Sequence, residues 1–230
     1  MLKINDTLFI IPARGGSKGL PRKNILQIKG KPLICYTIDA ARGVSNDENI
    51  CVSTDDIEIK QVVEDYGLNI PFLRPEKLAT DRAGTREVLL HAIDFYEKKS
   101  NQIFSKICLL QPTSPLRTLR HIFEAHKLWE NTLDMVVSVK ESKENPYTLS
   151  TENNNGFLEK VKINSYTQRQ QFPKFWQYNG AIYFINIKSL KKKAISEFKN
   201  VKKYEMNDSD SIDIDDEIDL ELVKVIFDKK

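Results

Sequence analysis

Residues 8–24 read LFIIPARGGSKGLPRKN, and the character of the chain changes abruptly within this stretch. The first four residues, Leu8 to Ile11, form a continuous apolar run, which is typical of a strand buried on both faces of a parallel sheet. Pro12 has no backbone N–H and ends the strand. The residues after it therefore lie at the carboxyl end of a first strand, where open α/β sheets place their ligands.

The loop after this strand is both glycine-rich and basic. Its glycines permit tight turns and a close approach of the backbone to a ligand. Backbone amides together with several cations can surround a polyphosphate. The residues concerned are Gly15, Gly16 and Gly19, with Arg14, Lys18, Arg22 and Lys23 among them. A basic surface turn without a ligand is the alternative interpretation.

Two better-known phosphate loops do not match this stretch. The P-loop requires a glycine, four residues and then Gly-Lys-Ser/Thr, but the pair Gly30-Lys31 is followed by Pro32 and has Ile25 at the glycine position. The glycines of the loop also fail to give the G-x-G-x-x-G fingerprint of dinucleotide-binding folds. The loop therefore predicts a phosphate site of a different kind.

Alternating apolar segments predict an α/β fold with a mostly parallel sheet flanked by helices. After the loop we expect a helix at 32–42, a strand at 49–53 and a helix at 57–66. Thr54, Asp55 and Asp56 separate the last two, and Thr54 or Asp55 is the expected helix cap, although the acidic pair could instead meet a ribose. A short strand at 70–73 and a loop at 74–85, RPEKLATDRAGT, follow, and a helix then runs to Tyr96.

A second strand that ends in polar residues lies at 106–111, KICLLQ, and PTSPLR follows it directly. The two prolines exclude a helix before Leu119. We therefore expect Gln111, Thr113, Ser114 and Arg117 at the same sheet edge as the glycine-rich loop. Gln111 could instead serve only to cap the strand. A helix at 119–129 and a strand at 134–139 complete this part.

The final third of the chain begins with a polar segment at 140–175, in which Asn153 to Gly156 mark a hairpin turn. We interpret it as a small lobe inserted into a single domain that spans 1–230. NGAIYFINI at 179–187 predicts a strand. SIDIDDEID at 211–219 precedes an amphipathic helix, and its acids would favour the N-terminus of that helix.

Composition excludes several classes. The formal net charge of +3 is too small to suggest nucleic-acid binding by bulk charge. Cys35, Cys51 and Cys108 lie in apolar runs and predict buried free thiols, hence a reducing, cytoplasmic compartment. No secretion signal opens the sequence and no apolar run is long enough to span a membrane, so a soluble protein is expected. The three histidines have no ligand-like spacing, which argues against zinc.

Five of these segments resemble the CMP-sialic acid synthetases, the N-acylneuraminate cytidylyltransferases. The opening stretch IPARGGSKGLPRKN is similar to their signature and differs from that of the related CMP-KDO synthetases after the arginine. RPEKLATDRAGT, LLQPTSPLR, NGAIYFINI and SIDIDDEID are similar to further family segments. The resemblance implies a Rossmann-like nucleotidyltransferase fold, CTP and a nine-carbon 2-keto sugar acid as substrates, and Mg²⁺ (or Mn²⁺) as the cofactor. It also implies a homodimer in which the inserted lobe reaches the active site of the second subunit.

The resemblance also assigns roles to individual residues. Phosphates are expected at Arg14, Lys18 and Lys23, as catalytic cations, with Ala13, Gly15, Gly16 and Ser17 beside them. The nucleoside is expected at Asn24, Arg74, Ala83 and Thr85, the sugar acid at Gln111, Arg169, Asn179 and Tyr183, and the metal at Asp213 and Asp215. Gln177 departs from the pattern, since some sialic acid synthetases have arginine there, and this leaves the choice of acid open.

The predicted function is therefore transfer of a cytidylyl group from CTP to the sugar acid with release of pyrophosphate. Alignment and electrostatic stabilisation would dominate such a reaction. A nucleotide-binding regulatory protein of the same fold without turnover is the rival hypothesis. A dinucleotide-dependent oxidoreductase is disfavoured because the glycine fingerprint is missing.

Overall fold

The computed structural model describes residues 3–16, 19–100, 103–161 and 172–229. In this part of the chain, the main sheet has six strands in the order β10-β6-β9-β5-β1-β4. The strands are β1 (Thr7–Pro12), β4 (Ile50–Ser53), β5 (Lys106–Leu109), β6 (Met135–Glu141), β9 (Trp176–Asn186) and β10 (Val201–Glu205). All neighbours pair in parallel except β9, which runs antiparallel to β5 and β6. The predicted α/β fold with a mostly parallel sheet is confirmed.

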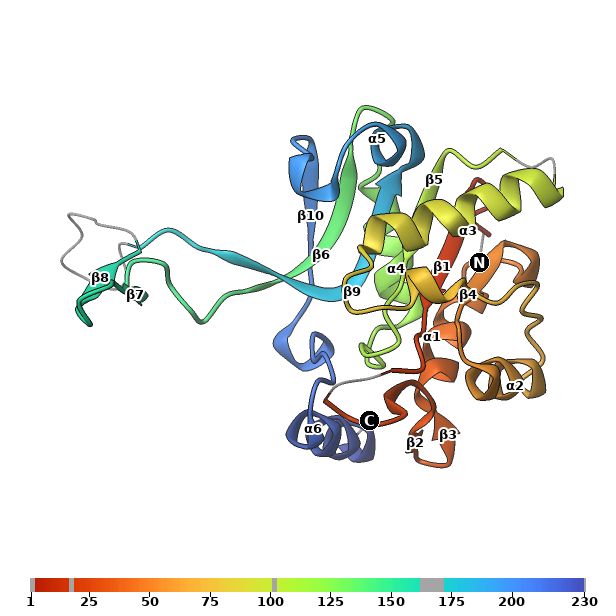
Figure 1. Ribbon diagram of the computed structural model, residues 1–230, viewed down its shortest axis with the longest axis horizontal. Coiled ribbons are helices and arrows are strands. Elements are labelled where there is room, and N and C mark those ends of the chain that lie inside the picture. The colour runs from red at the N-terminus through yellow and green to blue at the C-terminus, as the bar shows by residue number, and fades with distance from the viewer. Residues whose placement is uncertain (1–2, 17–18, 101–102, 162–171, 230) are drawn as a thin grey trace.

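Helices cover both faces of the sheet (Figure 1). They are α1 (Leu33–Arg42), α2 (Ile57–Asp65), α3 (Thr85–Ser100), α4 (Leu119–Lys127), α5 (Ile187–Lys192) and α6 (Glu217–Lys229). Small two-stranded sheets are formed by β2 (Gln27–Ile28) with β3 (Lys31–Pro32) and by β7 (Ser150–Glu152) with β8 (Leu158–Lys160).

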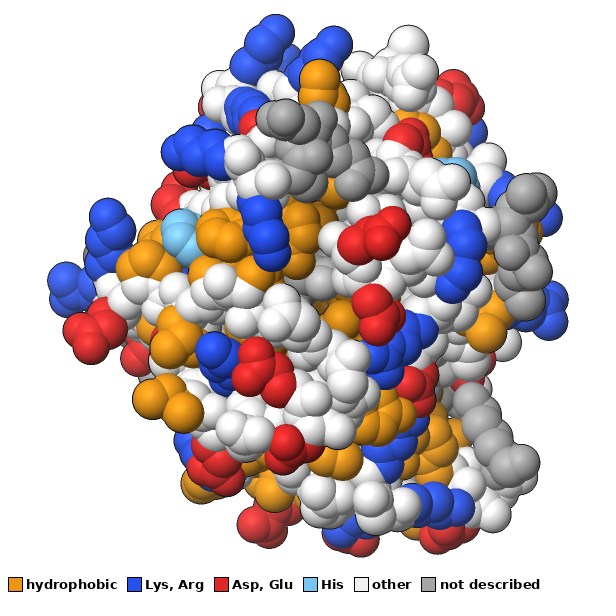
Figure 2. All heavy atoms as spheres, turned by 90° about the vertical axis from the view of Figure 1, so that its right-hand side faces the viewer, with side chains coloured by type: hydrophobic (Ala, Val, Ile, Leu, Met, Phe, Trp, Pro, Cys, Tyr) orange, Lys and Arg blue, Asp and Glu red, His pale blue; other side chains and the backbone are white. Residues whose placement is uncertain are grey.

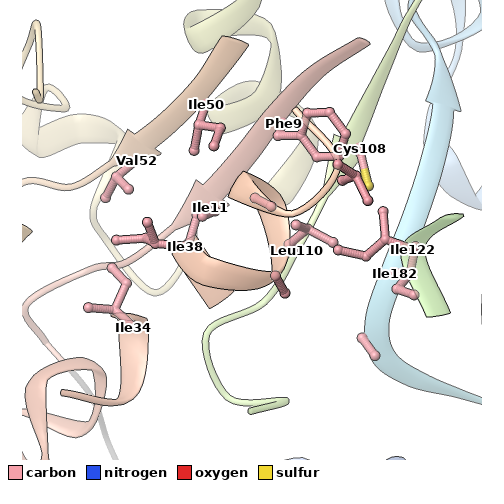
Figure 3. Packing of buried hydrophobic residues seen from close by; sticks show 14 of the residues in the cluster. Phe9, Ile11, Ile34, Ile38, Ile50, Val52, Cys108, Leu110, Ile122 and Ile182 are labelled. Atoms are coloured by element: carbon pink, nitrogen blue, oxygen red, sulfur yellow. The ribbon is translucent and has the colours of Figure 1, made fainter. Parts of the chain in front are cut away.

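Strand β1 shows why the opening apolar run becomes a central strand. Phe9 and Ile11 pack into the cluster with α1, α2 and α4, where Ile34, Ile38 and Ile122 surround them (Figure 3). Leu8 and Ile10 point to the opposite face and pack against α3 and α5. All four side chains have no exposed surface. Burial of each side chain contributes roughly 1.5–3 kcal/mol to folding stability. A strand that is buried on one face only would gain this from every second residue.

Two expectations about local structure are wrong. Residues 70–73 form no strand. Pro71 lacks a backbone N–H, and the backbone hydrogen bond to the segment after β4 comes from Arg74 N, which donates to Thr54 O at 2.7 Å. Helix α2 is capped by Asp56, whose side chain accepts from Ile59 N, rather than by Thr54 or Asp55. Thr54 Oγ1 accepts from Asp56 N instead and shapes the turn before the helix.

Residues 140–161 and 172–175 leave the core as an arm (Figure 1). The ends of β6 and β9 pair along its stem, where Glu141 lies opposite Trp176, and the β7–β8 hairpin lies at its tip. The predicted turn at 153–156 joins these two strands, with Gly156 at φ +81°. The arm points away from the sheet, so the hydrophobic core of the same chain does not cover the arm.

On the face opposite the arm, basic and acidic side chains are interspersed, as Figure 2 shows. This agrees with the small formal net charge of the whole chain. Among the described residues, none of the helices combines the length and apolar character needed to cross a bilayer.

Candidate active site

The glycine-rich loop is held against the second βα turn. Ala13 N donates to Ser53 O at 2.9 Å, which continues the pairing of β1 with β4, and Gly15 N donates to Asp55 Oδ1 at 3.3 Å. A Cβ atom on Gly15 would lie 2.4 Å from Asp56 Oδ2, and one on Gly19 would lie 2.2 Å from Asp215 O. Both positions therefore require glycine for close approach. Gly16 has open space around it, as a loop that faces a ligand would.

A cavity of about 740 Å³ opens beside this loop at the carboxyl ends of β1 and β5. Its volume falls within the range of small-molecule sites. It brings together segments that lie far apart in the sequence. Nine of the predicted site residues line it: Arg14, Lys23, Asn24, Arg74, Ala83, Thr85, Gln111, Asp213 and Asp215.

The cations at the cavity are paired with carboxylates. Arg14 Nη1 lies 2.7 Å from Asp81 Oδ1. Lys23 Nζ donates to Ile214 O at 2.6 Å and lies 3.2 Å from Asp215 Oδ1. The Lys23 side chain is only 13% exposed, so its charge acts where water is partly excluded. Arg22, by contrast, does not line the cavity, since it pairs with Asp56 and Glu58 on the outer side of the loop.

Arg74 and Asn24 line the cavity and are both buried. Arg74 Nε donates to Ser53 Oγ at 3.1 Å, and a further short hydrogen bond joins its Nη2 to Ser53 O. Burial lowers the pKa of Arg74. Asn24 Nδ2 donates to Arg14 O at 3.0 Å and fixes the start of the loop. Thr85 begins α3, and Ala83 lies just before it.

The loop after β5 contributes Gln111 and Thr113 to the cavity, but not Arg117. Arg117 is buried, and its Nη1 donates to Gln111 O at 3.1 Å and to Ala181 O at 3.0 Å. Its Nη2 donates to Thr37 Oγ1 at 2.6 Å. Burial lowers the pKa of Arg117 to about 10. The expectation that Arg117 is presented at the sheet edge is wrong, because the guanidinium instead joins this loop to α1 and β9.

Asp213 and Asp215 lie on one side of the segment before α6, while Ile214 is fully buried between them. Asp213 Oδ1 is buried and has no hydrogen-bond partner among the described residues. Burial raises the pKa of Asp213, and the nearby charge of Asp215 adds to this, while Thr113 and Lys23 oppose it. Asp216 Oδ1 accepts from Asp219 N at 3.0 Å, so Asp216 caps the N-terminus of α6.

A second cavity of about 670 Å³ shares Asp213 and Asp215 with the first and lies between the base of the arm and α6. Gln177 and Asn179 line it, and so does Leu222. Asn179 is buried, however, and its amide bonds Ser138 Oγ at 2.6 Å and Ser211 Oγ at 2.9 Å. Tyr183 is a partly buried member of the sheet core, and burial raises its pKa. A side chain that contacts a sugar directly would be expected to expose its polar atoms, but the Asn179 amide is already hydrogen-bonded and Tyr183 is partly buried.

Three predicted site residues, Ser17, Lys18 and Arg169, lie outside the described residues. Two residues at the site were missed by the sequence reasoning. Asp81 pairs with Arg14, and Gly180 lies against Gln111 and Asp213. Asp81 could have been predicted as a site residue, because it is an acidic residue within the loop at 74–85 that was assigned to the nucleoside. Nothing in the sequence places Gly180 beside residues 111 and 213.

The predicted buried thiols are confirmed. Cys35, Cys51 and Cys108 are free and buried. Burial raises the pKa of Cys35 to about 11 and that of Cys51 to about 12. Thiols of this kind remain protonated at neutral pH and are poor nucleophiles. None of them lines the first cavity.

A family model described as cytidylyltransferase matches residues 8–230. The chain is 38% identical to CMP-N,N'-diacetyllegionaminic acid synthase of Legionella pneumophila, over 96% of this chain and 95% of that protein. It is 36% identical to N-acylneuraminate cytidylyltransferase of Escherichia coli O18:K1:H7, over 97% of this chain. The chain spans about half the length of that relative, 52%. Pseudaminic acid cytidylyltransferase of Campylobacter jejuni is 32% identical, over 96% and 95% of the two chains.

Solved structures share the fold. A CMP-2-keto-3-deoxy-manno-octonic acid synthetase in complex with CTP superposes with a TM-score of 0.72 at 18% identity, and the match covers 97% of this chain and 98% of that one. A 4-diphosphocytidyl-2C-methyl-D-erythritol synthase from Anaerococcus prevotii superposes with a TM-score of 0.60 at 14% identity, over 96% and 99%. At these identities the likeness supports the architecture alone.

Proposed function

Because this chain belongs to the cytidylyltransferase family, we propose that it transfers the cytidylyl group of CTP to a nine-carbon 2-keto sugar acid and releases pyrophosphate. One observation carries the proposal. A single cavity brings together Arg14 and Lys23 of the glycine-rich loop, the polar Gln111, and the acidic pair Asp213 and Asp215. The cations suit a triphosphate, the Gln111 amide suits a polar sugar acid, and the two carboxylates suit a divalent cation.

In the proposed reaction the anomeric hydroxyl oxygen forms a bond to the α-phosphorus, and its proton passes to solvent water. The bond from that phosphorus to the oxygen bridging toward the β-phosphorus breaks, and pyrophosphate takes the electron pair. Arg14 and Lys23 would stabilise the charge that grows on the leaving group, since both reach the cavity from the loop at the end of β1. Residues Arg74, Ala83 and Thr85 at its other side would hold the nucleoside.

We propose Mg²⁺ as the cofactor, held by Asp213 and Asp215. The unpartnered Asp213 Oδ1 fits a hard cation, which prefers carboxylate oxygens. Among the described residues, no cluster of three or more His, Cys, Asp or Glu is placed to bind a metal. Two protein carboxylates with the remaining positions left to phosphate and water is the arrangement that Mg²⁺ usually takes beside a nucleotide. When bound, it would neutralise phosphate charge; Mn²⁺ could replace it.

A homodimer is the proposed assembly. The arm exposes Phe157 and Leu158 to 70% and 76%, and Leu149 and Val161 are exposed beside them. Apolar side chains gathered on an extended arm mark an interaction site. A second copy would cover them and bring its arm toward the cavity between the arm base and α6. The buried free thiols fit the reducing conditions of a cytoplasmic enzyme.

The decisive test is a pyrophosphate-release assay with CTP and a panel of acids: N-acetylneuraminate, its deaminated form, legionaminate and pseudaminate. Release with at least one acid is expected in Mg²⁺ or Mn²⁺. The Legionella and Campylobacter relatives make legionaminate and pseudaminate the informative members of the panel. If CTP binds but no acid supports release, the regulatory alternative replaces the enzyme.

A further inference from the structure

Strand β9 carries a pronounced bulge beside the site. Val137 of β6 pairs with Tyr183, but Val139, two residues later, pairs with Tyr178. Residues 179–182 therefore lie opposite Ser138 alone. Gly180, within this bulge, has φ +76°, a conformation that side chains other than glycine rarely adopt. Bulges often redirect side chains next to active sites, so the question is what this one positions.

Gly180 lies in contact with two of the predicted site residues. A Cβ atom at this position would lie 2.7 Å from Gln111 Oε1 and 3.1 Å from Asp213 Oδ2. One of these atoms belongs to the predicted sugar contact and the other to the predicted metal ligand. The missing side chain thus provides the space in which the amide and the carboxylate converge.

The bulge cannot easily move away from these neighbours. Ser138 Oγ accepts from Ile182 N at 2.8 Å and donates to Asn179 Oδ1 at 2.6 Å. Arg117 holds Ala181 O and Gln111 O at the same time. Asn179 Nδ2 donates to Ser211 Oγ, in the segment that continues to Asp213. Buried hydrogen bonds on both sides of Gly180 therefore fix it relative to both side chains.

The far end of Gln111 is the softer neighbour. Its amide can rotate about flexible side-chain bonds, whereas the backbone of the bulge is held by three buried polar side chains: Ser138, Asn179 and Arg117. A methyl group at position 180 would therefore displace the Gln111 amide first and crowd the Asp213 carboxylate second. The displacement costs little folding free energy, but it changes where both groups point.

We propose that Gly180 is a positioning residue, which sets the orientation of the Gln111 amide toward the sugar acid and of the Asp213 carboxylate toward the cation. It touches neither substrate nor metal itself. The inference rests on the proposed function for the sugar-acid part, while the part that concerns the cation can be measured by binding alone.

The experiment compares Gly180→Ala with Gly67→Ala in the full chain. Gly67 has a similar φ of +80°, but the nearest atom to its Cβ position is Arg42 Nη2 at 3.9 Å, so it reproduces the backbone strain without the crowding. Gly180→Ala should raise the KM for the sugar acid about tenfold, the loss of roughly one hydrogen bond of 1.4 kcal/mol. Mn²⁺ affinity, followed by electron paramagnetic resonance with and without CTP, should fall severalfold. CTP affinity without metal should stay within twofold, and Gly67→Ala should change thermal stability alone.

A double-variant cycle separates positioning from strain. In a Gln111→Ala background the amide is already gone, so adding Gly180→Ala should change the KM for the acid by less than about twofold, while the loss of Mn²⁺ affinity persists. An equal rise in KM in both backgrounds would overturn the proposal, as would a Gly180→Ala variant that behaves like Gly67→Ala. If the wild-type chain turns over no acid, the proposed function fails, and the Mn²⁺ titration still decides the role of Gly180.

Discussion

The two cavities that share Asp213 and Asp215 are built in different ways. The first lies at the ends of β1 and β5, and its cations Arg14 and Lys23 are already paired with carboxylates of the same chain. The second lies between the arm and α6, where Leu222 is 46% exposed. In the proposed homodimer, one subunit would preform the proposed nucleotide side of the site, whereas the proposed acid side would depend on the arm and on the second copy that covers it.

The largest effect should come from the cation of the first cavity. Lys23→Ala should lower turnover about a hundredfold, on the order of 3 kcal/mol, because Lys23 would stabilise charge that develops in the transition state. Steady-state pyrophosphate release measures this. Lys98→Ala, in an exposed helical ion pair with Asp94, is the matched control and should leave turnover unchanged. Near-normal turnover of a folded Lys23→Ala variant would show that the glycine-rich loop is not the phosphate-binding site.

The carboxylates between the cavities should show the next largest effect. Asp213→Asn and Asp215→Asn should each lower turnover by tenfold or more and raise the Mg²⁺ concentration needed, because each removes a proposed ligand. Asp216→Asn should leave turnover nearly intact and lower stability by about 0.5–2 kcal/mol, since Asp216 caps α6. Loss of metal dependence in Asp216→Asn, or equal behaviour of all three variants, would contradict this division of roles.

The raised pKa of Asp213 predicts how stability and the Mg²⁺ requirement depend on pH. Because burial raises the pKa of Asp213, its ionisation disfavours the folded state, and the stability that its protonated form provides is lost as the pH rises through this raised pKa. Asp213→Asn should therefore raise the Tm at neutral pH while activity falls. The Mg²⁺ requirement of the wild type should increase on acidification at pH values above those of an ordinary aspartate, and a flat requirement down to pH 4 would argue against Asp213 as a ligand.

Much of this architecture can be predicted from the sequence because a buried parallel strand leaves a local signal. The apolar runs at β1, β4, β5 and β6 mark the sheet, and polar residues directly after β1 and β5 mark the first cavity. Strand β10 was missed because it lies at the sheet edge, where its residues are exposed or only partly buried, so VKKYE shows no apolar run. Its charges are typical of an edge that must not pair with other chains.

Features that depend on distant contacts could not be predicted in the same way. The direction of β9 and its bulge follow from pairing with β5 and β6, which no local pattern reports. The burial of Arg117 could likewise be recognised only from the tertiary structure, because a basic residue in a polar loop is normally exposed. The second cavity is a tertiary product of segments at 140–144, 177–179 and 208–226, and its apolar wall reads in the sequence only as one side of an amphipathic helix.

The arm offers a direct test of the incomplete second cavity. Replacing Phe157 and Leu158 together by serine should weaken dimerisation tenfold or more, because these are the most exposed large apolar side chains among the described residues of the arm. Sedimentation velocity over a range of concentrations measures it. The KM for the sugar acid should rise as the dimer dissociates, while CTP binding stays constant. Ile103→Ser, at an 89% exposed site away from the arm, should alter neither, and a monomeric wild type would refute the assembly.

The smallest expected effect concerns the ion pair at the mouth of the first cavity. Arg14 and Asp81 lie 2.7 Å apart with side chains 34% and 52% exposed, so the pair contributes at most about 1 kcal/mol. If Arg14 binds a phosphate of CTP, Asp81 competes with the nucleotide for the same guanidinium. Asp81→Asn should therefore lower the Kd for CTP by about twofold to fivefold.

Salt separates this competition from a change in shape. Added salt screens exposed ion pairs, so the advantage of Asp81→Asn should shrink between 50 mM and 500 mM NaCl, measured by isothermal titration of CTP. Asp47→Asn, which removes the partner of Arg42 on another part of the surface, should leave CTP affinity unchanged at both concentrations. Weaker CTP binding by Asp81→Asn would mean that Asp81 supports the bound nucleotide rather than competing with it. The preformed pairs of the first cavity would then be part of the binding site, and Arg14 would retain its carboxylate partner when the triphosphate is bound.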